Sequence, residues 1–146
     1  MRHRKSAAAI PIFAALITAT MIQSVFFGTP IHDVSAVTVS QSLGVYWNRY
    51  CTKTVSSIDW GALSPGALEE VVVYVRNYAR VPITLNLTAV TWSPENARLY
   101  LNFTWNCKYP KLRFYQVQAV YLTLTVDPSI TGISNFSFNI LFDTSQ

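Results

Sequence analysis

Alternation of apolar and polar residues, repeated segment after segment beyond residue 37, is the feature that most constrains how this chain folds. Residues 69–77, 99–105, 120–126 and 136–142 each place apolar side chains at every second position. Successive side chains of a β-strand point to opposite faces, so this period of two predicts half-buried strands. No segment after residue 37 shows the three-to-four-residue spacing of an amphipathic helix. The alternation therefore predicts an all-β domain.

Turn signals divide this domain into seven or eight short strands. Ser64-Pro65-Gly66 is the strongest of these signals, and residues 93–96 read as a turn or one helical turn capped by Ser93. Short strands with one apolar face each are typical of two packed antiparallel sheets, so we predict an immunoglobulin-like β-sandwich. The expected strands are 37–43, 45–47, 55–60, 69–77, 83–88, 99–105, 120–126 and 136–142.

The N-terminal 36 residues predict export through a membrane. Basic residues at positions 2–5 precede a stretch from Ser6 to Ile31 without a charged side chain. Val34-Ser35-Ala36 offers small residues to a signal peptidase, which would leave a mature chain from Val37. Residues 7–27 are also long enough for a membrane-spanning helix. We divide the chain into a signal peptide or anchor, residues 1–36, and a domain, residues 37–146.

A third interpretation of the N-terminus is a pilin leader. The segment Arg4-Lys5-Ser6-Ala7-Ala8-Ala9-Ile10-Pro11 resembles the start of archaeal type IV pilins, in which a basic leader is cut before a retained apolar helix. Ser6 stands where those leaders usually carry Gly or Ala, and this apolar stretch has no early acidic residue. All three interpretations place the domain outside the cell, either on the membrane or secreted.

The net charge of +4 gives no sign of nucleic-acid binding. Three of the basic residues precede the apolar stretch, and most of the others are scattered along the chain, whereas a nucleic-acid surface needs a dense basic stripe. We therefore expect no nucleic-acid partner.

The cysteines and three glycosylation motifs fit an exported domain. Cys51 and Cys107 are the only cysteines, and in an oxidising compartment we expect them to form a disulfide, with a pair of free thiols as the alternative. Asn-x-Ser/Thr motifs predict glycosylation at Asn86, Asn102 and Asn135. Each asparagine falls on the polar face of its expected strand.

The residue inventory argues against catalysis. His3 and His32 are the only histidines, so residues 37–146 cannot assemble a Ser-His-Asp or Cys-His site. Zinc ligands are too few, and solvated structural roles explain the carboxylates. We predict no enzymatic activity, no cofactor and no metal. Four tyrosines on the polar strand faces form a possible binding surface: Tyr46, Tyr74, Tyr100 and Tyr121.

One stretch carries a family resemblance. Ser57-Ile58-Asp59-Trp60-Gly61, the Pro65-Gly66 turn and the strand Val71 to Asn77 resemble a group of small archaeal membrane-anchored or secreted proteins with one immunoglobulin-like domain. The resemblance covers residues 44–142 and carries no catalytic residues. The position of a second Pro-Gly turn is occupied here by Phe114-Tyr115-Gln116.

These observations predict a cell-surface or secreted module with a structural, adhesive or protein-interaction role. One alternative is a filament subunit, either pilin-like through the helix of residues 7–27 or exchanging a strand through residues 37–43. The other is a carbohydrate-binding module that uses the surface tyrosines. We expect contact with the membrane through the N-terminal helix if it is retained, a protein or glycan partner at the cell surface, and possible self-association.

Overall fold

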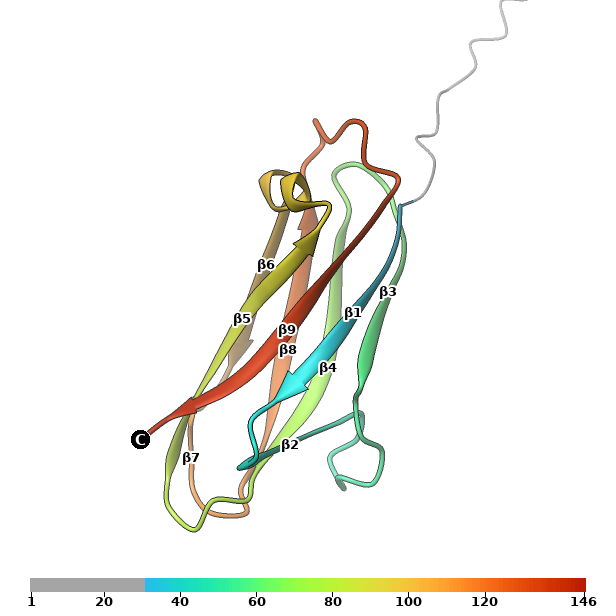
Figure 1. Cartoon of the computed structure of the whole chain (residues 1–146). Coiled ribbons are helices and arrows are strands. Elements are labelled where there is room, and N and C mark those ends of the chain that lie inside the picture. The colour runs from blue at the N-terminus through green and yellow to red at the C-terminus, as the bar shows by residue number, and fades with distance from the viewer. Residues whose placement is uncertain (1–30) are drawn as a thin grey trace, which may run out of the picture.

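A computed structural model describes residues 31–146, which form a sandwich of two β-sheets (Figure 1). The only helix in this range is a short 3-10 helix, η1 (Glu95–Leu99), which begins after Pro94 without a side-chain cap, so the expected cap at Ser93 is not formed. The nine strands are β1 (Ile31–Val39), β2 (Leu43–Tyr46), β3 (Ser57–Leu63), β4 (Leu68–Asn77), β5 (Ile83–Ser93), β6 (Leu101–Cys107), β7 (Lys111–Leu112), β8 (Val117–Val126) and β9 (Asn135–Ser145).

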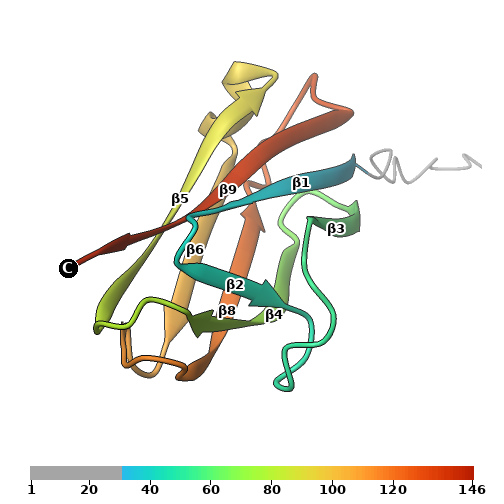
Figure 2. The same ribbon diagram turned by 60° about the horizontal axis from the view of Figure 1, so that its bottom comes forward.

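The strands alternate strictly between the two sheets. Sheet A has the order β3-β1-β9-β5-β7, and sheet B has the order β2-β4-β8-β6 (Figure 2). Every connection therefore crosses from one sheet to the other. In an immunoglobulin sandwich several consecutive strands are neighbours in one sheet. The predicted sandwich is confirmed, but its strand order differs from the immunoglobulin arrangement, because periodicity reveals which residues face inward and not which strands pair.

Strand β1 lies inside sheet A and begins earlier than the domain start predicted at residue 37. It pairs antiparallel with β3, from Ile31 opposite Leu63 to Ala36 opposite Ser57, and parallel with β9. The strand expected over residues 37–43 is thus the end of β1, a turn and the start of β2. The predicted N-terminal helix lies outside the described residues. Within residues 31–146, no helix has the length and apolarity needed to cross a membrane.

The core lies between the inner faces of the sheets. Phe138 of β9 is fully buried and stacks on Trp92 at 4.3 Å and on Trp60 at 6.3 Å between ring centroids. Burial of such side chains drives folding at about 1.5–3 kcal/mol each. The largest fully buried side chains are Phe138, Phe142, Ile58, Leu63, Leu112, Leu122, Leu124, Ile140, Val73, Val75, Val120 and Val126.

A small polar cluster interrupts this core beneath β1. Asp33 and Ser35 are buried, the Ser35 hydroxyl donates to Asp33 Oδ2 at 3.3 Å, and Trp60 Nε1 donates to Ser35 Oγ at 2.9 Å. Asp33 Oδ1 is buried without a hydrogen-bond partner. Burial raises the pKa of Asp33 to about 7, although the Ser35 hydrogen bond opposes this shift.

Candidate binding surface

Three of the four predicted surface tyrosines share the outer face of sheet B. Tyr46 of β2 lies directly opposite Tyr74 of β4, and Tyr121 of β8 lies opposite Val72 on the same face. The fourth, Tyr100, follows η1 and packs partly buried against the core. The sequence pattern placed Tyr100 in a strand, whereas β6 begins one residue later. Tyr100 is therefore not part of the surface that the other three tyrosines share.

Tyr46 is part of a packed aromatic cluster at one end of sheet B. Its hydroxyl lies 2.6 Å from the hydroxyl of Tyr78, which follows β4. This hydrogen bond is the main cause that raises the pKa of Tyr46 to about 12. Gly44 makes room for the pair, because a β-carbon there would lie 2.5 Å from Tyr46 Cε2 and 2.7 Å from Tyr78 Cε2. The two rings are therefore held in place by their contacts.

Arg76 joins this cluster to a second pair of rings. Its guanidinium carbon lies 5.9 Å from the Tyr78 centroid and 5.5 Å from the Tyr115 centroid, within the range of cation–π contacts. Tyr78 meets Tyr115 edge to face at 5.6 Å, and Phe114 meets Tyr115 at 4.7 Å. Arg76 Nε is buried without a partner. The result is a connected set of four rings and one arginine.

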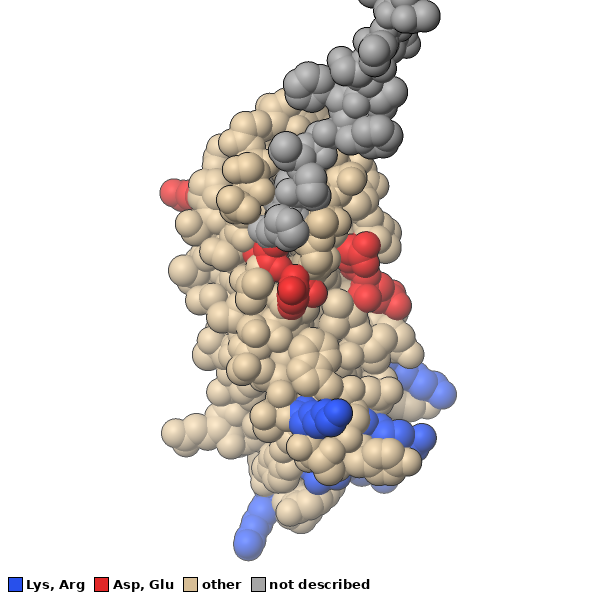
Figure 3. Space-filling view, turned by 90° about the vertical axis from the view of Figure 1, so that its right-hand side faces the viewer, with Lys and Arg blue, Asp and Glu red and all other residues tan. Residues whose placement is uncertain are grey.

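Basic residues and exposed aromatic rings gather at the end of the sandwich where β4 and β6 finish. In residues 31–146 no carboxylate forms a salt bridge with any of these basic residues. Figure 3 shows the basic side chains in the lower part of the molecule and acidic ones higher up. We call this region the basic–aromatic end and define it by Arg49, Lys53, Arg76, Arg80, Lys108, Lys111, Arg113, Tyr50, Tyr78, Tyr109, Phe114 and Tyr115.

The opposite end is acidic, and the described chain enters there. Glu69 and Glu70 lie in the first part of β4, Glu95 opens η1, and Asp127 follows β8. Of the eight basic residues in residues 31–146, only Arg98 lies outside the basic–aromatic end, and it pairs with Glu95 at 3.2 Å. Ile31 opens β1 beside Leu63, which puts the chain entry at this acidic end. Asp143 is the exception, because it lies opposite Asn86 near the start of β5, two residues from the Thr84–Lys111 pair and thus toward the basic–aromatic end.

Two open hollows lie at the basic–aromatic end. One, of about 450 Å³, is lined by Arg49, Tyr50, Tyr74, Val117 and Ala119. The other, of about 490 Å³, is lined by Tyr109, Lys111, Arg113, Phe114 and Gln116. The first combines one basic side chain with two aromatic rings, the second combines two of each, and neither is an enclosed cavity. The surface therefore suits an extended, negatively charged partner better than a small buried ligand.

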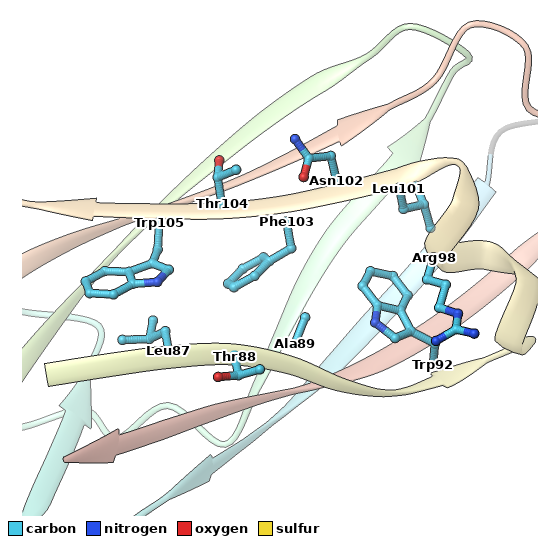
Figure 4. Close-up of a pocket in the computed structure, with 10 residues that line it drawn as sticks. All are labelled: Leu87, Thr88, Ala89, Trp92, Arg98, Leu101, Asn102, Phe103, Thr104 and Trp105. Carbon is cyan, nitrogen blue, oxygen red and sulfur yellow. The ribbon is translucent and has the colours of Figure 1, made fainter. Parts of the chain in front are cut away.

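A groove runs along the side of the sandwich where β5 and β6 face each other (Figure 4). Its volume is about 550 Å³, and Trp92, Phe103 and Trp105 point into it. Strand β6 ends sheet B, and β7 covers only Ile83 and Thr84 of β5. Leu85 N also donates to Pro110 O at 2.9 Å. The backbone edges of β5 beyond Leu85 and of β6 are therefore not paired within residues 31–146.

The predicted disulfide between Cys51 and Cys107 is not formed in this structure, where both cysteines are free. Cys51 follows β2 at one edge of sheet B, whereas Cys107 ends β6 at the other edge. Two strands lie between, which separates β2 from β6 by about 14 Å, twice the Cα distance that a disulfide tolerates. Burial raises the pKa of the Cys107 thiol.

The three predicted glycosylation sites are accessible. Asn86, Asn102 and Asn135 are exposed, and their strands turn the middle residue of each motif inward or partly inward. Glycosylation itself stays a prediction. Within residues 31–146, no group of three or more His, Cys, Asp or Glu side chains is placed to hold a metal ion.

Comparison with known proteins does not identify the chain. No protein-family model matches it, and no curated protein matches it significantly.

Sequence reasoning missed most of the basic–aromatic end. Tyr78, Phe114 and Tyr115 lie just outside strands, where alternation assigns no face. One signal was present, because Arg49-Tyr50, Lys108-Tyr109 and Arg113-Phe114 each place a basic residue next to an aromatic one. Arg49 and Lys108 indeed lie 5.9 and 5.1 Å from the ring centroids of Tyr50 and Tyr109.

Proposed function

We propose that this protein is a non-enzymatic module displayed on the cell surface that binds an acidic partner through its basic–aromatic end. The observation that carries the proposal is the separation of charge along the sandwich. Seven of the eight basic residues in residues 31–146 lie at one end, together with five exposed aromatic rings. Arginine and tyrosine are enriched among residues that dominate binding energy, and a field of one sign speeds the approach of an oppositely charged partner.

The position of β1 argues against cleavage after Ala36, the site that the sequence offers for secretion. Cleavage after Ala36 would remove Ile31 to Ala36, which supply every pairing partner of β3. It would also remove Asp33 and Ser35 from beneath Trp60. An N-terminal segment retained together with these residues enters at the acidic end. The basic–aromatic end then points away from the membrane, where partners approach.

Binding to cell envelopes tests this proposal. The full chain in detergent micelles is mixed with envelope fractions and sedimented at rising salt concentration. We expect binding that weakens with salt, and that falls about tenfold when Lys111 and Arg113 are both replaced by Ala. Arg98→Ala at the acidic end is the matched control and retains binding. Equal binding by all three proteins at every salt concentration contradicts the proposal.

The groove favours a second candidate, a subunit that assembles by strand addition. Unpaired edges of β5 and β6 flank partly exposed aromatic rings, and such an edge is a template for a strand from another chain. Residues 37–43 are not the free strand, because residues 37–39 are the end of the centrally paired β1. Filaments seen by electron microscopy, and lost on Thr88→Lys with Thr104→Lys, would support this candidate. Thr123→Lys on central strand β8 is the control.

A further inference from the structure

We propose that the ligand of the basic–aromatic end is an acidic polysaccharide, bound along a track of alternating rings and cations. This inference rests on the proposed function and names the chemistry of its partner. The track starts at the hollow of Arg49, Tyr50 and Tyr74, crosses the cluster of Tyr46, Arg76, Tyr78 and Tyr115, and ends at the hollow of Tyr109, Lys111, Arg113 and Phe114.

The two hollows are lined by neighbouring parts of the chain. Gln116 lines one hollow and Val117 the other, and these residues are neighbours in sequence. Tyr115 precedes them and contacts Arg76 on one side and Phe114 on the other. We infer that a ligand spanning both hollows passes over the Arg76 cluster, which Tyr115 links to Phe114 of the second hollow.

The side chains on the track match the two chemical features of an acidic sugar polymer. The apolar face of a pyranose ring stacks on an aromatic ring, and Tyr50, Tyr109 and Tyr115 expose 75%, 54% and 56% of their surface for this contact. Carboxylate or sulfate groups bind guanidinium and ammonium groups, with arginine able to make paired hydrogen bonds. Because both hollows are open, a long polysaccharide can pass through them, and binding does not require either end of the polymer to be buried.

The rings are held in position before any ligand arrives. The hydroxyl contact of Tyr46 with Tyr78 and the edge-to-face contact of Tyr78 with Tyr115 restrict three side chains. Tyr115 itself has a φ of +60° in a turn closed by the hydrogen bond from Gln116 N to Arg113 O at 3.0 Å. A left-handed conformation is unfavourable for a non-glycine residue, and here it accompanies the contacts of Tyr115 with Tyr78 and Phe114. Side chains ordered in advance lose less entropy on binding.

Location favours a polysaccharide over the other polyanions. The basic–aromatic end lies opposite the chain entry, so a protein anchored through its N-terminus does not press this end on its own membrane. In an exported protein the polyanions that surround it are chiefly surface polymers. The aromatic rings between the basic side chains also distinguish the track from a plain basic patch. A polyanion that has no ring to stack would contact the basic side chains of the track and leave its aromatic side chains unused.

Titration of the full chain in detergent micelles with four polymers tests this inference. The probes are polygalacturonate, neutral dextran, poly-L-glutamate and single-stranded DNA, and the readout is the change in intrinsic tyrosine and tryptophan fluorescence, with polymer sedimentation as a second measure. We expect polygalacturonate to bind at least tenfold more tightly than poly-L-glutamate, and dextran not to bind. Tyr50→Ala and Tyr115→Ala should each weaken polygalacturonate binding roughly tenfold, in line with the loss of an interface anchor.

Tyr121→Ala is the matched control, because Tyr121 is exposed on the outer face of sheet B but does not line either hollow. This variant should bind polygalacturonate as tightly as the unmodified chain. Equal binding of polygalacturonate and poly-L-glutamate overturns the polysaccharide inference and leaves the acidic-partner proposal standing. Tightest binding to DNA also overturns the inference. Failure of every polyanion to bind overturns both proposals.

Discussion

At the scale of single residues, one buried carboxyl group links the stability of this fold to pH. Asp33 is 2% exposed, and burial raises its pKa from 3.8 to about 7. The folded chain therefore holds the proton more tightly than the unfolded chain. The stability that protonated Asp33 contributes is fully present below pH 3.8. It is lost progressively as the pH rises through about 7. A shift of this size corresponds to about 4 kcal/mol at most.

We expect the urea midpoint of unfolding to fall between pH 4 and pH 8, and to change much less in Asp33→Asn, which keeps the shape without the charge. At pH 8 the variant should be the more stable protein. Asp59, whose charge also raises the pKa of Asp33, provides the comparison, since Asp59→Asn should reduce the pH dependence only slightly. Parallel pH profiles for the unmodified chain and Asp33→Asn would show that the carboxyl group is not responsible.

A second residue-scale prediction concerns Gly44, which lies beneath the Tyr46–Tyr78 pair. In Gly44→Ala the new methyl group must displace both rings, because its contacts would be 2.5–2.7 Å. We expect a loss of about 1–3 kcal/mol in the free energy of unfolding, measured by urea denaturation, together with weaker polyanion binding. Tyr46→Phe, which removes only the hydroxyl contact, should cost about 1 kcal/mol. An unchanged midpoint in Gly44→Ala would mean that the rings are not fixed there.

At the scale of elements, β1 is the strand whose loss should matter most. A chain that starts at Val37 lacks all six residues that pair with β3, and it leaves Trp60 Nε1 without its acceptor. An unmet buried donor alone costs about 1–3 kcal/mol. We expect the shortened chain to unfold at a lower temperature by circular dichroism, or to aggregate, whereas a chain that starts at Ile31 should keep the cooperative transition. Identical melting curves would show that β1 is dispensable.

Elements also show how far the sequence could predict this fold. The alternating strands over residues 69–77, 83–88, 120–126 and 136–142 are confirmed, because a half-buried strand must alternate. The strand order was not predictable, since pairing between strands distant in sequence leaves no local pattern. Likewise, β1 begins in residues that resemble an export signal, and Asp33 in its inward face breaks the alternation. Loop residues such as Tyr115 form the candidate site, and their positions depend on tertiary contacts.

At the scale of the whole molecule, the charge separation and the chain entry together predict an orientation on the membrane. The chain enters at the end of the sandwich that carries Glu69 and Asp127, so the acidic end should face the lipid surface and the basic–aromatic end should face outward. A bulky maleimide reagent can report this on the full chain in vesicles, with Cys51 and Cys107 replaced by Ser. Lys111→Cys at the outer end and Ser129→Cys at the acidic end introduce the two reporters, and both positions are exposed.

We expect Lys111→Cys to react in vesicles several times faster than Ser129→Cys, because nearby lipid excludes a large reagent from the acidic end. In detergent without a bilayer, the difference should shrink, which separates membrane shielding from local reactivity. The basic side chains around Lys111 favour the thiolate and account for some of the difference in both conditions. Only the additional ratio seen in vesicles therefore measures orientation. If the ratio of the two reaction rates is the same in vesicles and in detergent, the membrane shields neither end more than the other. That result would contradict the prediction that the basic–aromatic end faces outward.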